Sequence, residues 1–384
     1  MTPIYLDNAA TTKLDLRVFK AMMPYLKAEY GNASSIHNLG QKNNLVLEKK
    51  RREIADILGG EAAGIIFTSG ASEANNFILR GIMKANHKKG KHLIVSAIEH
   101  PSVYQTAKTL VGEGYELDFT PVDKNGIVDL KSLAKLIRPD TVLVSVMGVN
   151  NEIGSIQDLK AISKIVHVHG AIFHSDIVQA VPYLELNLEK NGVDCASLSA
   201  HKFYGPKGVG LAYVRPGIKI SPLISGGEQE NGWRAGTYNL PGIVGLSEAL
   251  KIAYRERSAY LRRVKELRDY LWLRLKKEIP NIKLNGGLTK RAENNLNIRF
   301  GRIEGEAILM DLSMRGICVS TGSACSAHNL KSSYVLAAIG LADYDLNSNI
   351  RLSLGRFNTK KELDYMVSVL KNAVSRLRAF TPVK

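Results

Sequence analysis

Cysteine is scarce in this sequence, with only 3 cysteines among 384 residues. So few thiols argue against a small secreted domain held together by disulfides. The N-terminal stretch reaches the charged Asp7 early and never builds the apolar core of a secretory signal. We therefore expect a cytoplasmic protein in which Cys195, Cys318 and Cys325 are reduced thiols.

Long apolar runs, internal repeats and low-complexity tracts are also absent. No apolar run approaches the length that crosses a bilayer, so we expect no membrane partner. The chain is 45% hydrophobic and 23% charged, an ordinary globular composition that argues against disordered and fibrous classes. The length suffices for two domains, and without a Pro/Ser-rich linker we expect them to pack closely.

Acidic residues are in the minority, since 36 Asp and Glu face 52 Lys and Arg, for a formal net charge of +16. Such a charge attracts phosphates, nucleic acid or acidic proteins. Much of the excess lies in residues 251–279, where apolar residues recur at helical spacing. These are Leu261, Val264, Leu267, Leu271 and Leu275. A charged outer face is normal for an amphipathic helix, so we do not expect direct nucleic-acid binding.

Residues 63–214 alternate short apolar runs with longer helical patterns. Five runs indicate strands: "AGIIFTSG", "KHLIVSA", "DTVLVSVMGV", "GAIFHSD" and "CASLSA". This alternation predicts an α/β fold with parallel strands, right-handed crossovers and helices on both faces of the sheet. Ligands gather at the C-terminal ends of such strands, which is where the unusual residues of this chain fall.

The remaining sequence predicts a smaller α+β domain. Strands are expected in "AENNLNIRF" and "ICVSTG", and helices over residues 304–316, 331–341 and 359–380. We place the large domain at residues 14–255 and the small domain at residues 1–13 and 256–384.

Three features after the strands point to one cofactor. "TSGASEANN" (residues 68–76) can turn helix N–H groups toward a phosphate, although a strand-to-helix turn needs small residues anyway. Asp176 is either a helix cap or a partner for a protonated ring nitrogen. Lys202, in "SLSAHKFYGPKGVG", is either a surface lysine or a partly desolvated amine that attacks an aldehyde. A Schiff-base lysine, an aspartate and a phosphate site are the parts that a pyridoxal phosphate enzyme needs.

The "STGSACSAHN" segment sets Cys325 among small polar residues. Backbone of this kind can bend, and an exposed thiol reaches the reactive thiolate state more easily than a buried one. Cys195, in "VDCASL", and Cys318, in "GICVS", fit the role of small buried hydrophobes. His167, His169 and His174 lack a cluster of further ligands, so we expect no resident metal site.

The motif series of the chain resembles that of the cysteine desulfurases of the class V aminotransferase family. The motifs are "YLDNAATT", "FTSGASEANN", "EHPSV", "VNNEIG", "DIVQA", "SAHKFYGPKGVG", "RAGTYN", "STGSACS" and "IRLSLGRF". The resemblance covers nearly the whole chain and is closest to the iron–sulfur-cluster-type branch with a long catalytic-cysteine loop. It implies a fold-type I aminotransferase architecture, a homodimer, pyridoxal phosphate, and conversion of L-cysteine to L-alanine. The sulfur would remain as a persulfide on Cys325 and pass to an iron–sulfur scaffold or another sulfur-acceptor protein, for cluster assembly or tRNA thiolation.

The resemblance also implies roles for individual residues. Lys202 would form the Schiff base, Asp176 would pair with the ring nitrogen, and His100 would stack on the ring and move protons. The other cofactor contacts would be Ala71, Ser72, Asn151, Gln179, Ser199, His201 and, from a partner subunit, Thr237. Substrate contacts would be Asn32, Asn151 and Arg351, the last holding the carboxylate through its planar fork. Transient ligation of an iron–sulfur cluster by Cys325 stays open.

Some positions depart from the usual pattern of the family, and other functions stay open. The departures are Ala33, Glu228, Trp233 and Ser332, none of which removes a reacting group. Within the same fold the alternative is a selenocysteine lyase or another pyridoxal phosphate lyase. From a different class, it is a basic, non-catalytic binding platform on the same scaffold. Cys325 argues against simple transamination, which needs no thiol.

Overall fold

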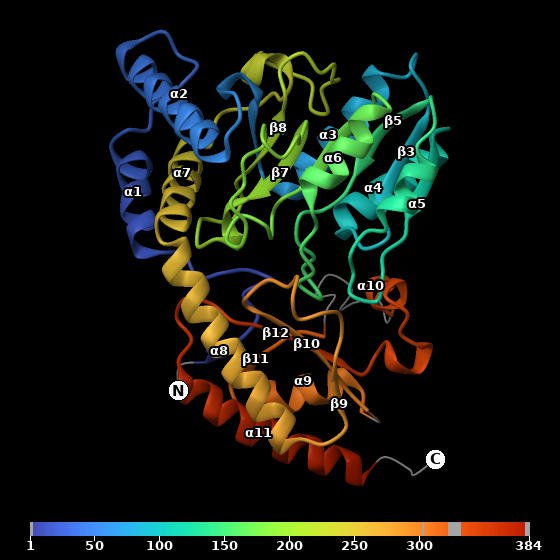
Figure 1. Ribbon diagram of the computed structural model, residues 1–384. Coiled ribbons are helices and arrows are strands. Elements are labelled where there is room, and N and C mark those ends of the chain that lie inside the picture. Colours follow the sequence, from blue (N-terminus) through green and yellow to red (C-terminus); the bar gives the residue numbers. More distant parts are fainter. Residues whose placement is uncertain (1–2, 302, 322–331, 381–384) are drawn as a thin grey trace.

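The computed structural model describes residues 3–301, 303–321 and 332–380, so Cys325 lies outside the described residues. Its largest element is a seven-stranded sheet (Figure 1). In spatial order the strands are β2 (Ile65–Thr68), β8 (Gly210–Val214), β7 (Cys195–Ser199), β6 (Ile172–Asp176), β5 (Thr141–Ser145), β3 (His92–Ser96) and β4 (Glu116–Thr120). This confirms the predicted α/β class.

The sheet is mostly parallel, as the sequence predicted, and one further strand runs the other way. β8 runs antiparallel to both β2 and β7, whereas the pairs among β7, β6, β5, β3 and β4 are parallel. The connection from β7 to β8, residues 200–209, is too short for the helical crossover that a parallel neighbour requires. The sequence patterns also missed β8 and β4 as strands; in β4, polar Glu116 and Asp118 alternate with the apolar residues at the sheet edge.

Helices cover both faces of this sheet because its strands are apolar on both sides. On β3, Leu93 and Val95 pack in one hydrophobic cluster, while Ile94 between them packs in the opposite cluster. The first cluster contains α3 (Ala71–Ala85) and α4 (Pro101–Gly112). The opposite cluster contains α2 (Asn38–Leu58), α5 (Leu130–Leu136), α6 (Leu159–Val168) and α7 (Leu240–Arg255), and α1 (Leu16–Lys27) packs on α7.

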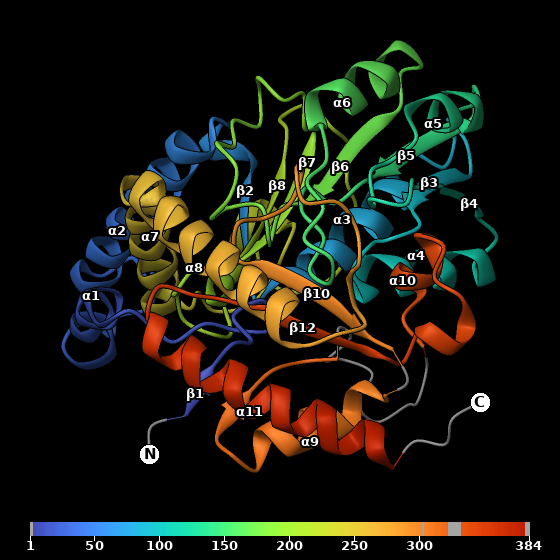
Figure 2. The same ribbon diagram turned by 60° about the horizontal axis from the view of Figure 1, so that its bottom comes forward.

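A second hydrophobic core lies around a smaller sheet, as the sequence predicted. β12 (Asn349–Ser353), β10 (Asn295–Phe300) and β9 (Ile282–Leu284) form an antiparallel sheet, and β1 (Ile4–Tyr5) pairs with β11 (Ile317–Cys318). The helices of this part are α8 (Arg257–Glu278), α9 (Gly305–Ser313), α10 (Tyr334–Ala338) and α11 (Lys360–Ala379). Figure 2 shows α8 and α11 lying alongside this sheet.

The basic stretch at residues 251–279, expected as one helix, is divided between two. α7 ends at Arg255 and α8 begins at Arg257, next to the boundary that we predicted between the domains, which itself stays a prediction. Val264, Leu271 and Leu275 are buried in the second core, as their spacing predicted. In the part of the chain that the structure describes, no helix has the length and apolar character to cross a membrane.

Candidate active site

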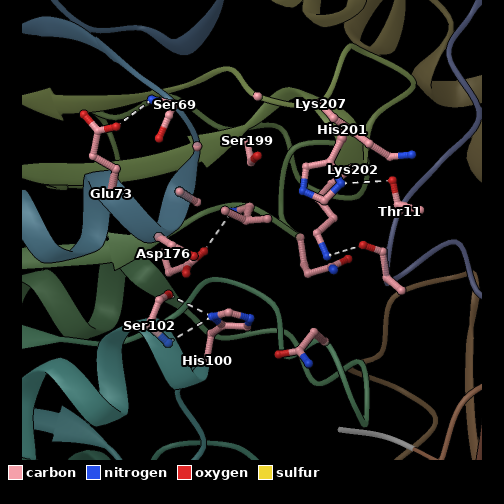
Figure 3. Close-up of a pocket in the computed structure, with 18 of the residues that line it drawn as sticks. Thr11, Ser69, Glu73, His100, Ser102, Asp176, Ser199, His201, Lys202 and Lys207 are labelled. Atoms are coloured by element: carbon pink, nitrogen blue, oxygen red, sulfur yellow. Dashed lines mark hydrogen bonds between the residues drawn. The ribbon is translucent and has the colours of Figure 1, made fainter. Parts of the chain in front are cut away.

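A cavity of about 440 Å³ lies at the C-terminal ends of β2, β3, β5, β6 and β7 (Figure 3). It gathers most of the cofactor residues expected from the sequence: Ala71, Ser72, His100, Asn151, Asp176, Gln179, Ser199, His201 and Lys202. These residues come from separate strand-to-helix connections. The parallel strands bring them together because their C-terminal ends meet at one edge of the sheet.

One end of the cavity is the start of α3. Gly70, its N-cap, has no side chain, and no hydrogen bond from a described side chain caps this first turn. First-turn N–H groups lack a helical partner, so Ala71 and Ser72 present donors where the helix dipole favours an anion. The main chain of β8 lies very close to the start of α3 at this point. A Cβ on Gly210 would lie 2.4 Å from the main-chain oxygen of Leu198 and 2.7 Å from the Cα of Gly70.

Asp176 supplies a buried carboxylate at the end of β6, with a relative exposure of 3%. Its Oδ1 accepts the main-chain N–H of Val178 at 3.0 Å, and its Oδ2 accepts the Asn75 amide at 2.9 Å. No α-helix begins between β6 and β7, so the helix-cap interpretation was wrong, and Asp176 caps a turn instead. Both donors are neutral, and they use only part of the accepting capacity of a carboxylate.

Lys202 lies half-buried in the turn after β7, and its side chain lines the cavity (Figure 3). The surface-lysine interpretation was therefore wrong. Its Nζ donates to the main-chain oxygens of Ala9 and Ala10 at 2.7 and 2.8 Å. The Gln179 amide donates to the same oxygen of Ala9 at 2.8 Å. The N-terminal segment thus closes one wall of the cavity, so the site needs residues from the C-terminal ends of the strands and from the beginning of the chain.

Two histidines of the site are held neutral. His100 is the N-cap of α4, and its Nδ1 accepts the main-chain N–H of Ser102 at 3.2 Å. Burial lowers the pKa of His100, and Lys202 lowers it further against the opposing effect of Asp176. Burial, with the positive charges of Lys202 and Lys207, lowers the pKa of His201 to about 4.

Three predicted residues lie outside the lining of this cavity. Arg351 is buried on β12, where it forms a 2.7 Å ion pair with Asp7 and donates to the main-chain oxygen of Asn151 at 3.0 Å. Arg351 therefore contacts the site indirectly, through Asn151, which lines the cavity. Thr237 lines an adjoining cavity of about 210 Å³, which shares Ser69 and Gly208 with the first. Asn32 lies exposed on the loop between α1 and α2, where its side chain accepts the N–H of Ser34.

Some residues of the site were not singled out from the sequence. The structure adds Asp7, Thr11, Asn75, Ser102 and Met147 to the site and its immediate support. The first four lie within motifs that carried the resemblance. Their position inside those motifs was the available signal, but their partners depend on the fold.

The other cysteines and histidines named from the sequence lie outside the cavity, where they pack or pair within the fold. Cys195 is fully buried beneath α3 and burial raises its pKa, while Cys318 is half-buried on β11. His167 pairs with Asp194 at 2.9 Å, and His174 lies fully buried within β6.

The chemistry of this cavity fits pyridoxal phosphate. A helix N-terminus suits the phosphate, a buried carboxylate held by neutral donors suits a ring N–H, and an amine suits the aldehyde carbon. These groups face the same space from different elements (Figure 3).

Comparisons with known proteins agree with this arrangement. The model of the family described as aminotransferase class V matches residues 4–366. The chain is 45% identical to the cysteine desulfurase IscS of Dictyoglomus turgidum, covering 99% of this chain and 97% of that protein. It is 44% identical to the cysteine desulfurase IscS 1 of Archaeoglobus fulgidus, covering 99% of each.

Solved structures give the same result. A NifS-like protein superposes with a TM-score of 0.92 at 38% identity, covering 98% of this chain and 100% of that one. SspA, solved in complex with cysteine, superposes with a TM-score of 0.81 at 31% identity, covering 93% of this chain and 100% of that one. Enzymes of this family depend on pyridoxal phosphate. The chain therefore belongs to the class V aminotransferase family and, within it, to the cysteine desulfurases.

Proposed function

We propose that this chain binds pyridoxal phosphate in the 440 Å³ cavity and converts L-cysteine to L-alanine, leaving the sulfur as a persulfide on Cys325. The observation that carries the proposal is the meeting of Lys202, Asp176 and His100 in one cavity beside the start of α3. When bound, the cofactor supplies an electrophilic carbon for the substrate amine and a ring that withdraws electrons from the substrate.

The residues of the cavity have distinct tasks. The N-terminus of α3, with Ser72, Ser199 and His201, would hold the phosphate, and Asp176 would keep the ring nitrogen protonated. Lys202, held near Ala9 and Ala10 in the resting site, would move a proton at the substrate α-carbon. Gln179 would contact the ring oxygen, and Asn151 would lie beside the ring.

Arg351 would hold the carboxylate of the substrate. Its guanidinium is fixed by the ion pair with Asp7 and by the bond to the oxygen of Asn151. A planar guanidinium held in this way meets a carboxylate through parallel N–H groups at little cost in side-chain entropy. Asn32 would add a substrate contact by movement or from a second copy of the chain, because it lies outside the cavity wall of one chain.

An exposed apolar surface supports a homodimer. Large apolar side chains are exposed along α1, α2 and the loop between them: Leu16, Phe19, Leu26, Tyr30, Ile36 and Leu45. Exposed apolar side chains gathered on neighbouring elements are typical of an interaction site. As the resemblance implies, Thr237 would then complete the phosphate site of the partner; in its own chain it lines the adjoining cavity.

The persulfide would pass to an iron–sulfur scaffold or another sulfur-acceptor protein. Cluster assembly and tRNA thiolation both need such a donor. The cytoplasm suits this role because it keeps catalytic thiols reduced between turnovers.

The test is alanine formed from L-cysteine by pyridoxal phosphate-loaded protein with a reductant present. We expect Cys325→Ala to lower the rate about 100-fold or more, because the attacking nucleophile is lost. Cys195→Ala and Cys318→Ala are matched controls and should stay within about twofold of wild type, since both thiols are held in the fold.

The outcomes separate the alternatives. Equal alanine formation by wild type and Cys325→Ala would refute the persulfide role. A wild type that releases alanine from L-selenocysteine but not from L-cysteine would be a selenocysteine lyase. A colourless protein that forms no alanine from either substrate would support the binding platform.

A further inference from the structure

The ring of His100 receives two hydrogen bonds at one nitrogen. Its Nδ1 accepts the main-chain N–H of Ser102 at 3.2 Å and lies 2.8 Å from the Ser102 hydroxyl oxygen. A main-chain N–H can only donate, so Nδ1 presents its lone pair to it. Figure 3 shows this side of the ring turned toward Ser102, with the opposite side facing the cavity.

Asn75 determines which way the Ser102 hydroxyl donates. Its Nδ2 amide donates to Ser102 Oγ at 2.8 Å and to Asp176 Oδ2 at 2.9 Å. Since Ser102 Oγ accepts from Asn75, its own proton is directed to His100 Nδ1. One buried amide therefore holds both the aspartate and the histidine of the cavity.

The orientation of the Asn75 amide is fixed by buried side chains of the large sheet. Ser197, on β7, donates its hydroxyl to Asn75 Oδ1, so the NH₂ group must face Asp176. His174 Nε2 lies 3.3 Å from Ser197 Oγ, and the Ser145 hydroxyl lies 2.8 Å from His174 Nδ1. Because Ser197 gives its proton to Asn75, it accepts from His174, whose Nδ1 then accepts from Ser145.

Every donor in this chain of hydrogen bonds points toward the cavity. The proton order runs from Ser145 through His174 and Ser197 to Asn75, and from there to both Asp176 and Ser102. Asn75, His174 and Ser197 have no exposed surface. Water therefore cannot reverse the bonds among these three side chains without leaving a buried polar group unsatisfied.

We propose that Asn75 and Ser102 are positioning residues that hold neutral His100 as the Nε2–H tautomer, so that the ring presents a hydrogen-bond donor to the cavity. The atom of a ligand that faces this ring is then an acceptor, such as the thiolate sulfur of a bound cysteine. The nearest charged groups are Asp176 and Lys202, which act on the ring in opposite directions. The statement about the substrate rests on the proposed function, whereas the tautomer does not.

The experiment is a long-range ¹H–¹⁵N correlation spectrum of protein labelled with ¹⁵N-histidine, recorded with and without pyridoxal phosphate. The two nitrogens of a neutral imidazole have well-separated shifts, so the spectrum identifies the protonated one. His100 is assigned by the signals lost in His100→Gln. We expect wild type to carry the His100 proton on Nε2 and Ser102→Thr, which keeps the hydroxyl, to give the same spectrum.

Ser102→Ala removes the hydroxyl at 2.8 Å and Asn75→Ala removes the donor that orients it, so that only the 3.2 Å main-chain contact still favours Nε2–H. Both variants should shift His100 toward a mixture of tautomers. In Ser102→Ala we expect alanine formation to fall about tenfold, the effect of one lost hydrogen bond. The fall should be larger in Asn75→Ala, which also removes a donor to Asp176. A wild-type spectrum with the proton on Nδ1 would overturn the proposal, and this result does not depend on the folding of any variant. Variant spectra identical to wild type would remove the positioning role. An inactive wild type with Nε2–H would refute the proposed function alone.

Discussion

Two buried aspartates at opposite ends of the large sheet have opposite electrostatic surroundings. Asp194, just before β7, has its charge matched within the protein by Arg215 at 2.7 Å, and the ring of His167 lies 2.9 Å from its other oxygen. Asp176, at the end of β6, accepts neutral N–H groups from Val178 and Asn75. Both carboxylates are buried, with relative exposures of 1% and 3%. The comparison teaches that the charge of the partners, and not burial, separates a carboxylate that holds the fold from one suited to a cationic ligand.

Substitution of Asp176 should give the largest effect on activity. We expect Asp176→Asn to lower alanine formation about 100-fold or more, because a neutral amide cannot hold the ring nitrogen protonated. Its free energy of unfolding should fall by about 1 kcal/mol, since the amide oxygen keeps one of the two neutral donors while the other loses its acceptor. Alanine assays and urea unfolding of the same preparations measure both. Near wild-type activity would contradict the role of this carboxylate.

Asp194→Asn is the matched substitution at the other end of the sheet and should show the reverse pattern. We expect a loss of about 2 kcal/mol in the free energy of unfolding, because Arg215 loses its counter-charge. The loss falls below the range for fully buried pairs since water reaches the half-exposed Arg215. Urea unfolding measures this loss. Activity per folded molecule should stay within about twofold of wild type, and a larger fall would mean that this end also supports the site.

The pH dependence of stability sharpens the comparison at His174, which lies on β6 between the two ends. Burial lowers the pKa of His174 to about 3, so the folded protein keeps the ring neutral while the unfolded chain binds a proton below the ordinary pKa of 6.5. Stability contributed by the neutral ring is therefore present above pH 6.5 and is lost as the pH falls toward 3.

We expect this group to account for about 2 kcal/mol of the loss between pH 7 and pH 5. Urea unfolding of wild type and His174→Asn at the two pH values measures it, since the variant keeps a polar group but cannot titrate. The test compares, between the two proteins, the change in the free energy of unfolding from pH 7 to pH 5. The stability at either pH alone is not compared. Parallel losses in the two proteins would show that His174 is not the responsible group.

Much of the fold followed from local patterns. The five predicted strands, the helices between them and the second α+β part all appear in the structure. The antiparallel β8 was missed because its direction depends on the length of the connection from β7, and a run of apolar residues carries no direction. The break at Glu256 was missed because apolar spacing continues in α8 beyond it.

The candidate site also contains residues that the sequence predicted and contacts that it did not. Lys202, Asp176 and the residues at the start of α3 were predicted because each follows a buried strand, and such positions meet at one edge of the sheet. Asn75, Ser102 and Asp7 were not predicted as partners. A hydrogen bond between side chains distant in sequence leaves no periodic signal.

The sequence by itself determined the α/β class, the family and the chemical groups available to the reaction, because strand patterns and motif residues are local properties of the chain. Only the tertiary structure decided what each group contacts. The carbonyls of Ala9 and Ala10 contact Lys202, and Asp7 pairs with Arg351. Asn75 joins Asp176 to Ser102, which contacts His100. The physical reason is that hydrogen bonds and ion pairs act over a few ångströms. Their partners are therefore chosen by the order and direction of the strands, which pack distant segments against one another.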